Sequence, residues 1–224
     1  MIETVGEILR RGANDVWKLG LSEAQIEQFE QFAALISEWN ATRMNLTRLT
    51  TPREIAVKHF LDSLTLLKAI DLPKNSRLID VGTGPGLPGL ALKIVRPDLQ
   101  VTLLDSTAKK LLFCRAAADA LGFADVETIH ARAEDAGRIP KLAGQFDFAV
   151  ARAVAPLDRL LPWLAPFAST GGQMIAMKGS SVAEEMAAAR PVARRLGLAF
   201  APLVSVTLPE AEEPTVRQIV VGRR

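Results

Sequence analysis

The segment RLIDVGTGPGLPGLALKIV, residues 77–95, constrains the fold more than any other part of this 224-residue chain. An apolar run typical of a strand is followed by a turn with glycines at 82, 84 and 86, and then by a run typical of a helix. Glycine allows positive φ and lets a ligand approach the main chain closely. A turn that binds nothing is the plainer alternative, but three alternate glycines after an acid exceed what a turn needs. We therefore expect a ligand-binding loop between a strand and a helix.

The chain after Pro73 continues this alternation of strands and helices. Such alternation is typical of an α/β fold with a mostly parallel central sheet and helices on both faces. The expected strands are 78–81, 101–104, 126–129, 146–151 and 174–177, and the expected helices are 87–95, 108–121, 157–167 and 182–196. Two more extended runs, 199–208 and 216–221, flank the acidic segment PEAEEP. We expect them to form a hairpin that ends the sheet, with one strand antiparallel to the rest.

The first part of the chain has a helical pattern instead. Capping-box patterns at Ser22 and Thr51 start two amphipathic runs, the first expected to form a helix over 23–39. We therefore divide the chain into an N-terminal helical extension, 1–73, that packs on a core domain, 74–224. No long linker or internal repeat separates the two parts.

The composition limits the classes of protein to consider. The net charge is +2, far from the strongly basic balance that indicates nucleic-acid binding by itself. No apolar run reaches the roughly 18–20 residues of a membrane helix, and acids and arginines interrupt the N-terminus, unlike a signal peptide. Cys114 is the only cysteine, and its apolar neighbours predict a core residue. We expect a cytoplasmic monomer with no membrane partner and no metal site.

One short stretch is locally basic. The stretch between residues 40 and 60 has one acidic residue, Glu54, and four basic residues, namely Arg43, Arg48, Arg53 and Lys58. A solvated surface is the more common meaning of such a run, and contact with phosphates is the alternative.

The glycine spacing identifies the ligand class. A nicotinamide-binding G-x-G-x-x-G motif requires glycine at 87, where Leu87 stands. The spacing D-x-G-x-G-x-G from Asp80 instead resembles the first motif of class I methyltransferases, whose cofactor is S-adenosylmethionine. The carboxylate of Asp80 complements the positive charges of that cofactor, directly or through water. Asp105 ends the second expected strand, where an acid accepts hydrogen bonds from ribose hydroxyls, although capping of the next helix is an alternative.

A more specific resemblance rests on motifs that occur in order from Trp39 to Gly179. They are WNATRMNLT at 39–47, HFLDSL at 59–64, GTGPGLPG at 82–89, LLDSTAKK at 103–110, ARAEDA at 131–136, ARA at 151–153 and MKG at 177–179. Together they resemble the bacterial RsmG (GidB) family, which methylates N7 of a guanine in the decoding-region loop of 16S ribosomal RNA. The resemblance implies a Rossmann-like class I methyltransferase fold, S-adenosylmethionine as cofactor, and 16S ribosomal RNA or the small ribosomal subunit as partner.

The resemblance also implies roles for individual residues. The cofactor contacts it implies are Gly82, Leu87, Ala133, Glu134 and Arg152. The glycine motif adds Asp80, Gly84 and Gly86, and the end of the second expected strand adds Asp105. It suggests that the RNA-facing mouth is bordered by His59, Lys109, Arg115 and Lys178. Simpler interpretations stay open: a core histidine, a solvated helix face, and for Arg152 a salt bridge to a nearby acid or a fork onto guanine. No role is transferred to residues before 39 or after 180.

The expected chemistry agrees with this assignment. Guanine N7 presents a lone pair in the neutral base, so methyl transfer needs alignment rather than a general base. We expect catalysis by positioning, with Arg152 as a candidate for that role. Two other hypotheses stay open: a methyltransferase for a small molecule or protein, and a non-catalytic ribosome-assembly module.

Overall fold

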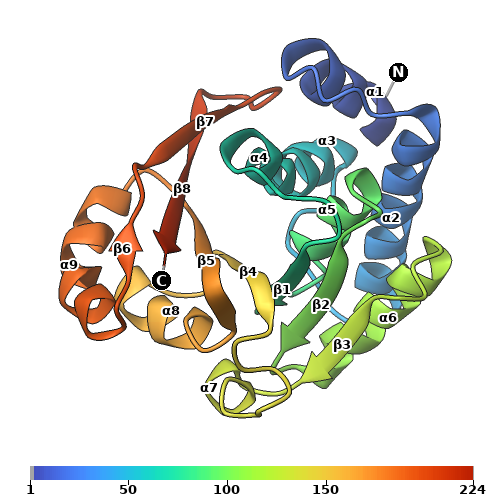
Figure 1. Ribbon diagram of the computed structural model, residues 1–224. Coiled ribbons are helices and arrows are strands. Elements are labelled where there is room, and N and C mark those ends of the chain that lie inside the picture. Colours follow the sequence, from blue (N-terminus) through green and yellow to red (C-terminus); the bar gives the residue numbers. More distant parts are fainter. Residues whose placement is uncertain (1–2, 224) are drawn as a thin grey trace.

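The computed structural model describes residues 3–223 and has one eight-stranded sheet between layers of helices (Figure 1). The strands are β1 (Arg77–Val81), β2 (Gln100–Asp105), β3 (Glu127–His130), β4 (Phe146–Arg152), β5 (Ala168–Lys178), β6 (Ala199–Phe200), β7 (Val204–Leu208) and β8 (Thr215–Arg223). Their order is β3-β2-β1-β4-β5-β8-β6, and β7 also pairs with β8. Strands β1 to β5 are parallel, and β8 runs antiparallel to β5. The prediction of a mostly parallel sheet with a final antiparallel hairpin is confirmed.

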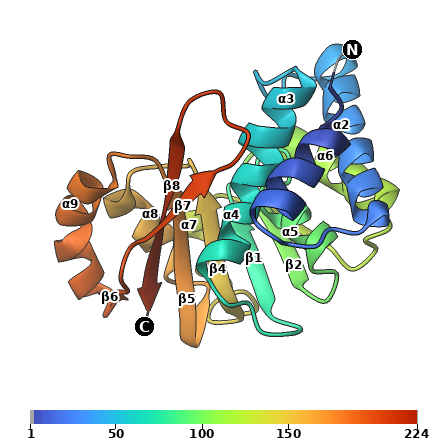
Figure 2. The same ribbon diagram turned by 90° about the horizontal axis from the view of Figure 1, so that it is seen from above.

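Helices cover both faces of this sheet. On one face lie α4 (Asp62–Ala69), α5 (Gly89–Val95) and α6 (Ala108–Ala120), and on the other lie α7 (Ala133–Ala136), α8 (Leu157–Leu164) and α9 (Val182–Arg195). Figure 2 shows α8 and α9 on one side of the strands and α4, α5 and α6 on the other. Each face has its own buried apolar cluster. Burial on both faces explains why β1 and β2 are continuous apolar runs.

Some element boundaries differ from the predicted ones. The helix expected over 157–167 ends at Leu164, because a helix usually stops before the residue that precedes a proline, here Pro166. The extended run 199–208 is split into β6 and β7 around Pro202, which has no N–H for a sheet hydrogen bond. Strand β5 begins at Ala168, six residues before the expected 174, where polar residues and two glycines conceal its start.

The N-terminal part is helical, as predicted. Its elements are α1 (Val5–Leu9), the π-helical η1 (Arg10–Val16), α2 (Glu23–Thr42), α3 (Pro52–Glu54) and the π-helical η2 (Ile55–Leu61). The capping boxes at Ser22 and Thr51 are both present. One apolar cluster runs from these helices into the sheet, and in it Phe32 lies 6.2 Å from Phe113 between ring centroids. The division of domains at residue 73 stays a prediction.

Within the described part of the chain, every helix is too short or too polar to cross a membrane.

Candidate functional site

A cavity of about 420 Å³ opens at the carboxyl ends of β1, β2 and β4. The helix that follows β1 covers one face of the sheet and the helix that follows β4 covers the other, so the loops diverge here. Ligands of open α/β sheets bind at such a point. The cavity is lined by five of the nine residues predicted to bind a cofactor: Gly82, Asp105, Ala133, Glu134 and Arg152.

The glycine loop reaches the cavity through backbone geometry. Gly82 has φ +72°, and a Cβ there would lie 2.8 Å from Cγ2 of Val154, another residue of the cavity wall. The backbone N–H groups of Gly82 and Thr83 donate to the carbonyl of Leu104, at 2.8 and 3.1 Å. The loop is thereby fixed to the end of β2, with its main chain exposed to the cavity.

Asp105 joins this loop to the loop after β2. Its Oδ2 accepts from the N–H of Gly84 at 3.0 Å, and its Oδ1 accepts from the N–H of Thr107 at 2.8 Å. Thr107 is the N-cap residue of α6, so the carboxylate also supports the start of that helix. Asp105 therefore lies in the cavity wall, as expected of a ribose ligand, and also supports the start of the next helix, as the alternative interpretation expected.

Asp80 lies beneath the loop rather than in the cavity wall. It is fully buried, and its Oδ2 accepts from Thr83 Oγ1 at 2.7 Å and from the N–H of Gly89 at 2.8 Å. Its Oδ1 has no hydrogen-bond partner among the described residues, and burial raises the pKa of the carboxyl to about 6. Gly86 and Leu87 are also buried and do not line the cavity. A direct cofactor contact by these three residues, and by Gly84, which also does not line the cavity, stays a prediction.

Gly89 is a structural residue that the sequence interpretation missed. A Cβ at this position would lie 2.5 Å from Leu103 Cδ2 and 3.1 Å from Asp80 Oδ2. Glycine therefore lets α5 start close to the sheet and donate to Asp80. The fourth glycine of GTGPGLPG was the available signal.

Arg152 has the salt bridge that was one of its alternatives. Its Nη1 donates to Asp62 Oδ2 at 3.1 Å and to the carbonyl of Lys58 at 2.9 Å. The other N–H groups of this guanidinium make no hydrogen bond within residues 3–223. Because Arg152 also lines the cavity, the salt bridge orients the side chain without removing it from the site.

A second cavity of about 370 Å³ adjoins the first, and the two share Arg152, Ala153 and Val154 in their walls. Lys178 lines it and pairs with Glu185 at 2.7 Å. It also contains Asp62 and Arg217, which the sequence interpretation did not select. The signal for Asp62 was an acid within the apolar motif HFLDSL, whereas nothing in the local sequence marked Arg217.

The four residues suggested to border RNA do not gather in one place. His59 is buried, its Nε2 lies 3.0 Å from Thr47 Oγ1, and its Nδ1 has no partner in the described structure. Burial, together with the positive charge of Arg152, lowers the pKa of His59 to about 4. Lys109 and Arg115 are exposed on α6, and Arg115 donates to the carbonyl of Val126. Their roles toward RNA stay predictions.

Comparison with known proteins decides the family. Residues 25–207 match the GidB family model, described as rRNA small subunit methyltransferase G. The chain is 45% identical over 180 residues to ribosomal RNA small subunit methyltransferase G of Thermoanaerobacter sp. (strain X514), which covers 80% of this chain and 74% of the relative. It is 42% identical over 223 residues to the protein of that name from Pelotomaculum thermopropionicum, covering 100% of this chain and 92% of the relative.

This chain belongs to the rRNA small subunit methyltransferase G family. Solved structures agree on the fold of this family member. A SAM-dependent methyltransferase from Aquifex aeolicus matches with a TM-score of 0.56 at 18% identity, covering 79% of this chain and 96% of that one. A ribosomal protein L11 methylase from Lactobacillus delbrueckii subsp. bulgaricus matches with a TM-score of 0.54 at 18% identity, covering 73% and 77%. The predicted class I methyltransferase fold is confirmed.

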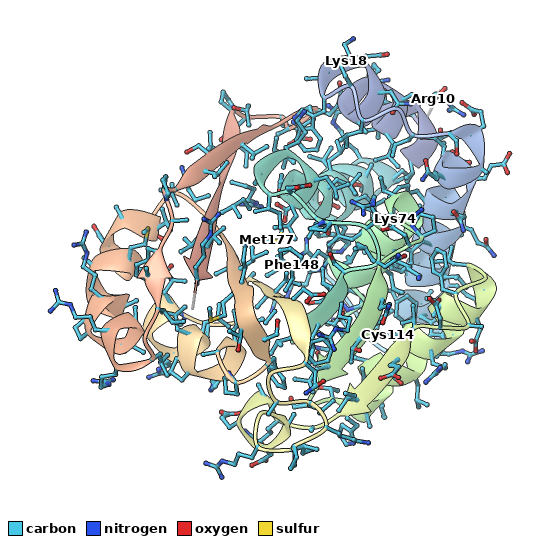
Figure 3. The ribbon with its side chains drawn as sticks, viewed as in Figure 1. Arg10, Lys18, Lys74, Cys114, Phe148 and Met177 are labelled. Atoms are coloured by element: carbon cyan, nitrogen blue, oxygen red, sulfur yellow. The ribbon has the colours of Figure 1, made fainter. Side chains whose placement is uncertain are left out.

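The first cavity fits S-adenosylmethionine, the cofactor of this fold. Its volume is that of a small-molecule site, Gly82 places main chain in the wall, and Asp105 places a carboxylate there. Cys114 is buried against the glycine loop, with Sγ 3.4 Å from the carbonyl of Gly84 (Figure 3). Burial raises the pKa of this thiol, so it stays protonated and acts as the core residue that was predicted.

Proposed function

We propose that this protein transfers the methyl group of S-adenosylmethionine to N7 of a guanine in the 16S ribosomal RNA of the small ribosomal subunit. The observation that carries the proposal is the pair of adjoining cavities at the carboxyl edge of the sheet, in a chain matched by the methyltransferase G model over residues 25–207. One cavity has the residues for the cofactor, and the other provides a place for the target base next to it.

The first cavity supplies the cofactor contacts in this proposal. The main chain at Gly82 contacts the methionine part, and Asp105 accepts hydrogen bonds from the ribose hydroxyls. Ala133 and Glu134, at the start of α7, contact the adenine edge. Arg152 uses its unengaged N–H groups to hold the cofactor's carboxylate.

The other residues predicted to bind the cofactor give the glycine loop its shape and hold it on the core. Asp80 anchors the loop through Thr83 and the start of α5 through Gly89. Gly84 and Gly86 have φ of +59° and +82°, which keep the turn tight. The buried side chain of Leu87 packs in the core under the same turn.

Positioning provides the catalysis in this proposal. The cofactor supplies a methyl group activated by a sulfonium, and the acceptor N7 has a lone pair without losing a proton. The chain therefore needs to align the base and exclude water, with no general base. The burial of His59 and Cys114 agrees with this, because neither side chain lines either cavity.

The place of action follows from the proposed substrate. Small ribosomal subunits of bacteria are cytoplasmic, so we propose the cytoplasm as the location and a monomer as the active form. The partner is either free 16S ribosomal RNA or the assembled subunit, and the assay below distinguishes these two.

A methyl-transfer assay tests the proposal. Purified small subunits and deproteinised 16S RNA from cells lacking the gene are incubated side by side with labelled S-adenosylmethionine, and the product is mapped by primer extension and nucleoside mass spectrometry. We expect one 7-methylguanosine with wild-type protein and slower formation of it with Gly82→Ala at a cofactor concentration near the wild-type Kd. Label in a ribosomal protein, in a metabolite or at another base atom would overturn the proposal.

A further inference from the structure

The second cavity contains three charged side chains joined in a row from distant parts of the chain. Asp62, on α4, accepts from Nη1 of Arg152 with its Oδ2 and from Nε of Arg217 with its Oδ1. Arg152 is the last residue of β4, and Arg217 lies in β8, 155 residues after Asp62 in the sequence. The Asp62 side chain is 5% exposed, so its charge is balanced by the two guanidinium groups rather than by water.

The bond to Asp62 engages one of the three nitrogens of the Arg217 guanidinium. Because Nε is engaged, the two Nη groups are the ones available to a ligand, and neither makes a hydrogen bond within residues 3–223. The side chain is 27% exposed and lines the second cavity. The Lys178 ammonium, by contrast, is already paired with Glu185 and with the carbonyl of Ala155. Arg217 and Arg152 therefore both offer free N–H groups in this cavity, and the proposed function assigns those of Arg152 to the cofactor.

We propose that Arg217 is a specificity-determining residue that donates a hydrogen bond to O6 of the target guanine in the second cavity, with Asp62 as the positioning residue that holds it. This inference rests on the proposed function. A guanidinium has donors and no acceptor, so it can donate to the carbonyl O6 of guanine and disfavours the amino group, itself a donor, at the same position of adenine.

The proposed contact has to leave N7 free for the reaction. An arginine commonly forks onto both O6 and N7, which would occupy the lone pair that receives the methyl group. In the proposed arrangement a single Nη group of Arg217 donates to O6, and N7 faces the cofactor with its lone pair open. Methyl transfer moves a positive charge from sulfur to the base, and the carboxylate behind the guanidinium reduces the repulsion.

Base analogues at the mapped position provide the test. Small subunits are reconstituted with ligated 16S RNA that carries guanosine, inosine, 2,6-diaminopurine riboside or 7-deazaguanosine at that position. Inosine keeps O6, diaminopurine has an amino group in its place, and both keep N7. We expect wild-type protein to methylate guanosine and inosine about tenfold to a hundredfold faster in kcat/KM than diaminopurine, the range for one hydrogen bond to a charged group.

The variants then assign that discrimination to one side chain. Arg217→Gln should lower kcat/KM on guanosine and inosine by about tenfold to a hundredfold and leave diaminopurine unchanged, while Arg217→Lys keeps a donor and part of the preference. Arg223→Gln, an exposed arginine on the same strand, is the matched control and should behave as wild type. Cofactor affinity should be unchanged in all three variants.

The outcomes separate this inference from the proposed function. Methylation of 7-deazaguanosine, or no methylation of guanosine by the wild type, would overturn the proposed function. With normal wild-type activity, an equal loss on guanosine and diaminopurine in Arg217→Gln, with a shallower salt dependence, would show a phosphate contact and overturn the role of Arg217. A loss of cofactor affinity with unchanged base preference would show that Arg217 acts only through Asp62 and Arg152, and would also overturn it.

Discussion

The two adjoining cavities are built by different physical means. The wall of the first is made by main chain and by residues at the ends of β1 to β4, with Val154 packed so closely on Gly82 that no Cβ fits there. The second is made by charged side chains from α4, β4, β5, α9 and β8 that balance one another. The first should therefore be sensitive to added atoms, and the second to the removal of one charge.

Each region also contains a buried titratable group with one unpartnered atom. Asp80 lies beneath the glycine loop, and His59 lies three residues before Asp62. Burial shifts both toward the neutral form, which raises the pKa of the acid and lowers that of the histidine. The two regions therefore respond to pH in opposite directions.

The largest effect is expected at the second cavity, from Asp62→Ala. This change leaves two guanidinium groups facing each other in a largely buried place, and breaking such a pair costs about 3–5 kcal/mol of unfolding free energy. Urea denaturation measures it. The control is Asp119→Ala, an exposed acid near the end of α6 that has no salt bridge in the described structure and should change stability by less than about 0.5 kcal/mol. Equal losses for both variants would contradict the charge-balanced construction.

The opposite pH responses are expected to be of similar size. Asp80 goes from a pKa of 3.8 to about 6 on folding, so it contributes stability below pH 3.8 that is lost as the pH rises through about 6. His59 goes from 6.5 to about 4, so its contribution is present above pH 6.5 and lost as the pH falls through about 4. Each group changes the free energy of unfolding by on the order of 3 kcal/mol across its pH range. The two contributions oppose each other between pH 4 and 6.

Single variants should separate these contributions. Relative to wild type, the unfolding free energy of Asp80→Asn should increase as the pH rises from 4 to 6, and that of His59→Gln should increase as the pH falls from 6.5 to 4. Urea denaturation at pH 4, 5, 6 and 7 measures both. Parallel pH profiles for the two variants would show that the groups are not buried as described.

A smaller effect is expected from Gly82→Ala. The new Cβ would lie 2.8 Å from Val154 Cγ2, so we expect Val154 to shift into the cavity and the cofactor to displace it at a cost of about 1–3 kcal/mol, which raises the Kd for S-adenosylmethionine about fivefold to a hundredfold. Calorimetry on the folded variant measures it. Gly144→Ala is the matched control, because Gly144 also has positive φ, +66°, but no atom within 4 Å of the added carbon. Equal cofactor affinity in the two variants would contradict the close approach at Gly82.

The smallest effect is expected outside both cavities, from Arg53→Ala. Arg53 is 39% exposed and bonds to Glu3 and to the carbonyl of Glu210, so it connects α3 to the turn between β7 and β8. Pairs at this exposure contribute about 1 kcal/mol or less. We expect urea denaturation to show a loss of unfolding free energy of that size, and we expect the Kd for the cofactor to be unchanged. A tenfold weaker cofactor affinity would show that the turn influences the first cavity.

The first cavity could be predicted from the sequence because its features are local. A strand, a glycine turn, a helix and an acid at the end of the next strand lie within 29 residues, from Arg77 to Asp105. Each has a physical signature, namely apolar periodicity, positive φ or a cap.

The second cavity could not be predicted, because its contacts join segments far apart in the chain. No spacing rule links Asp62 to Arg217 or fixes the depth at which Asp80 is buried. Close packing at Gly89 is likewise a property of the folded helix and sheet, not of the turn that precedes them. The family resemblance stopped at Gly179, so it gave no role to β8.

The most direct test of the central claim is the mapped product of methyl transfer to small subunits that lack the modification. We expect one labelled 7-methylguanosine in 16S ribosomal RNA with wild-type protein, and slower formation of it with Gly82→Ala at limiting cofactor. Tight binding of S-adenosylmethionine by well-folded protein, with no methyl group transferred to subunits or to free RNA, would contradict it.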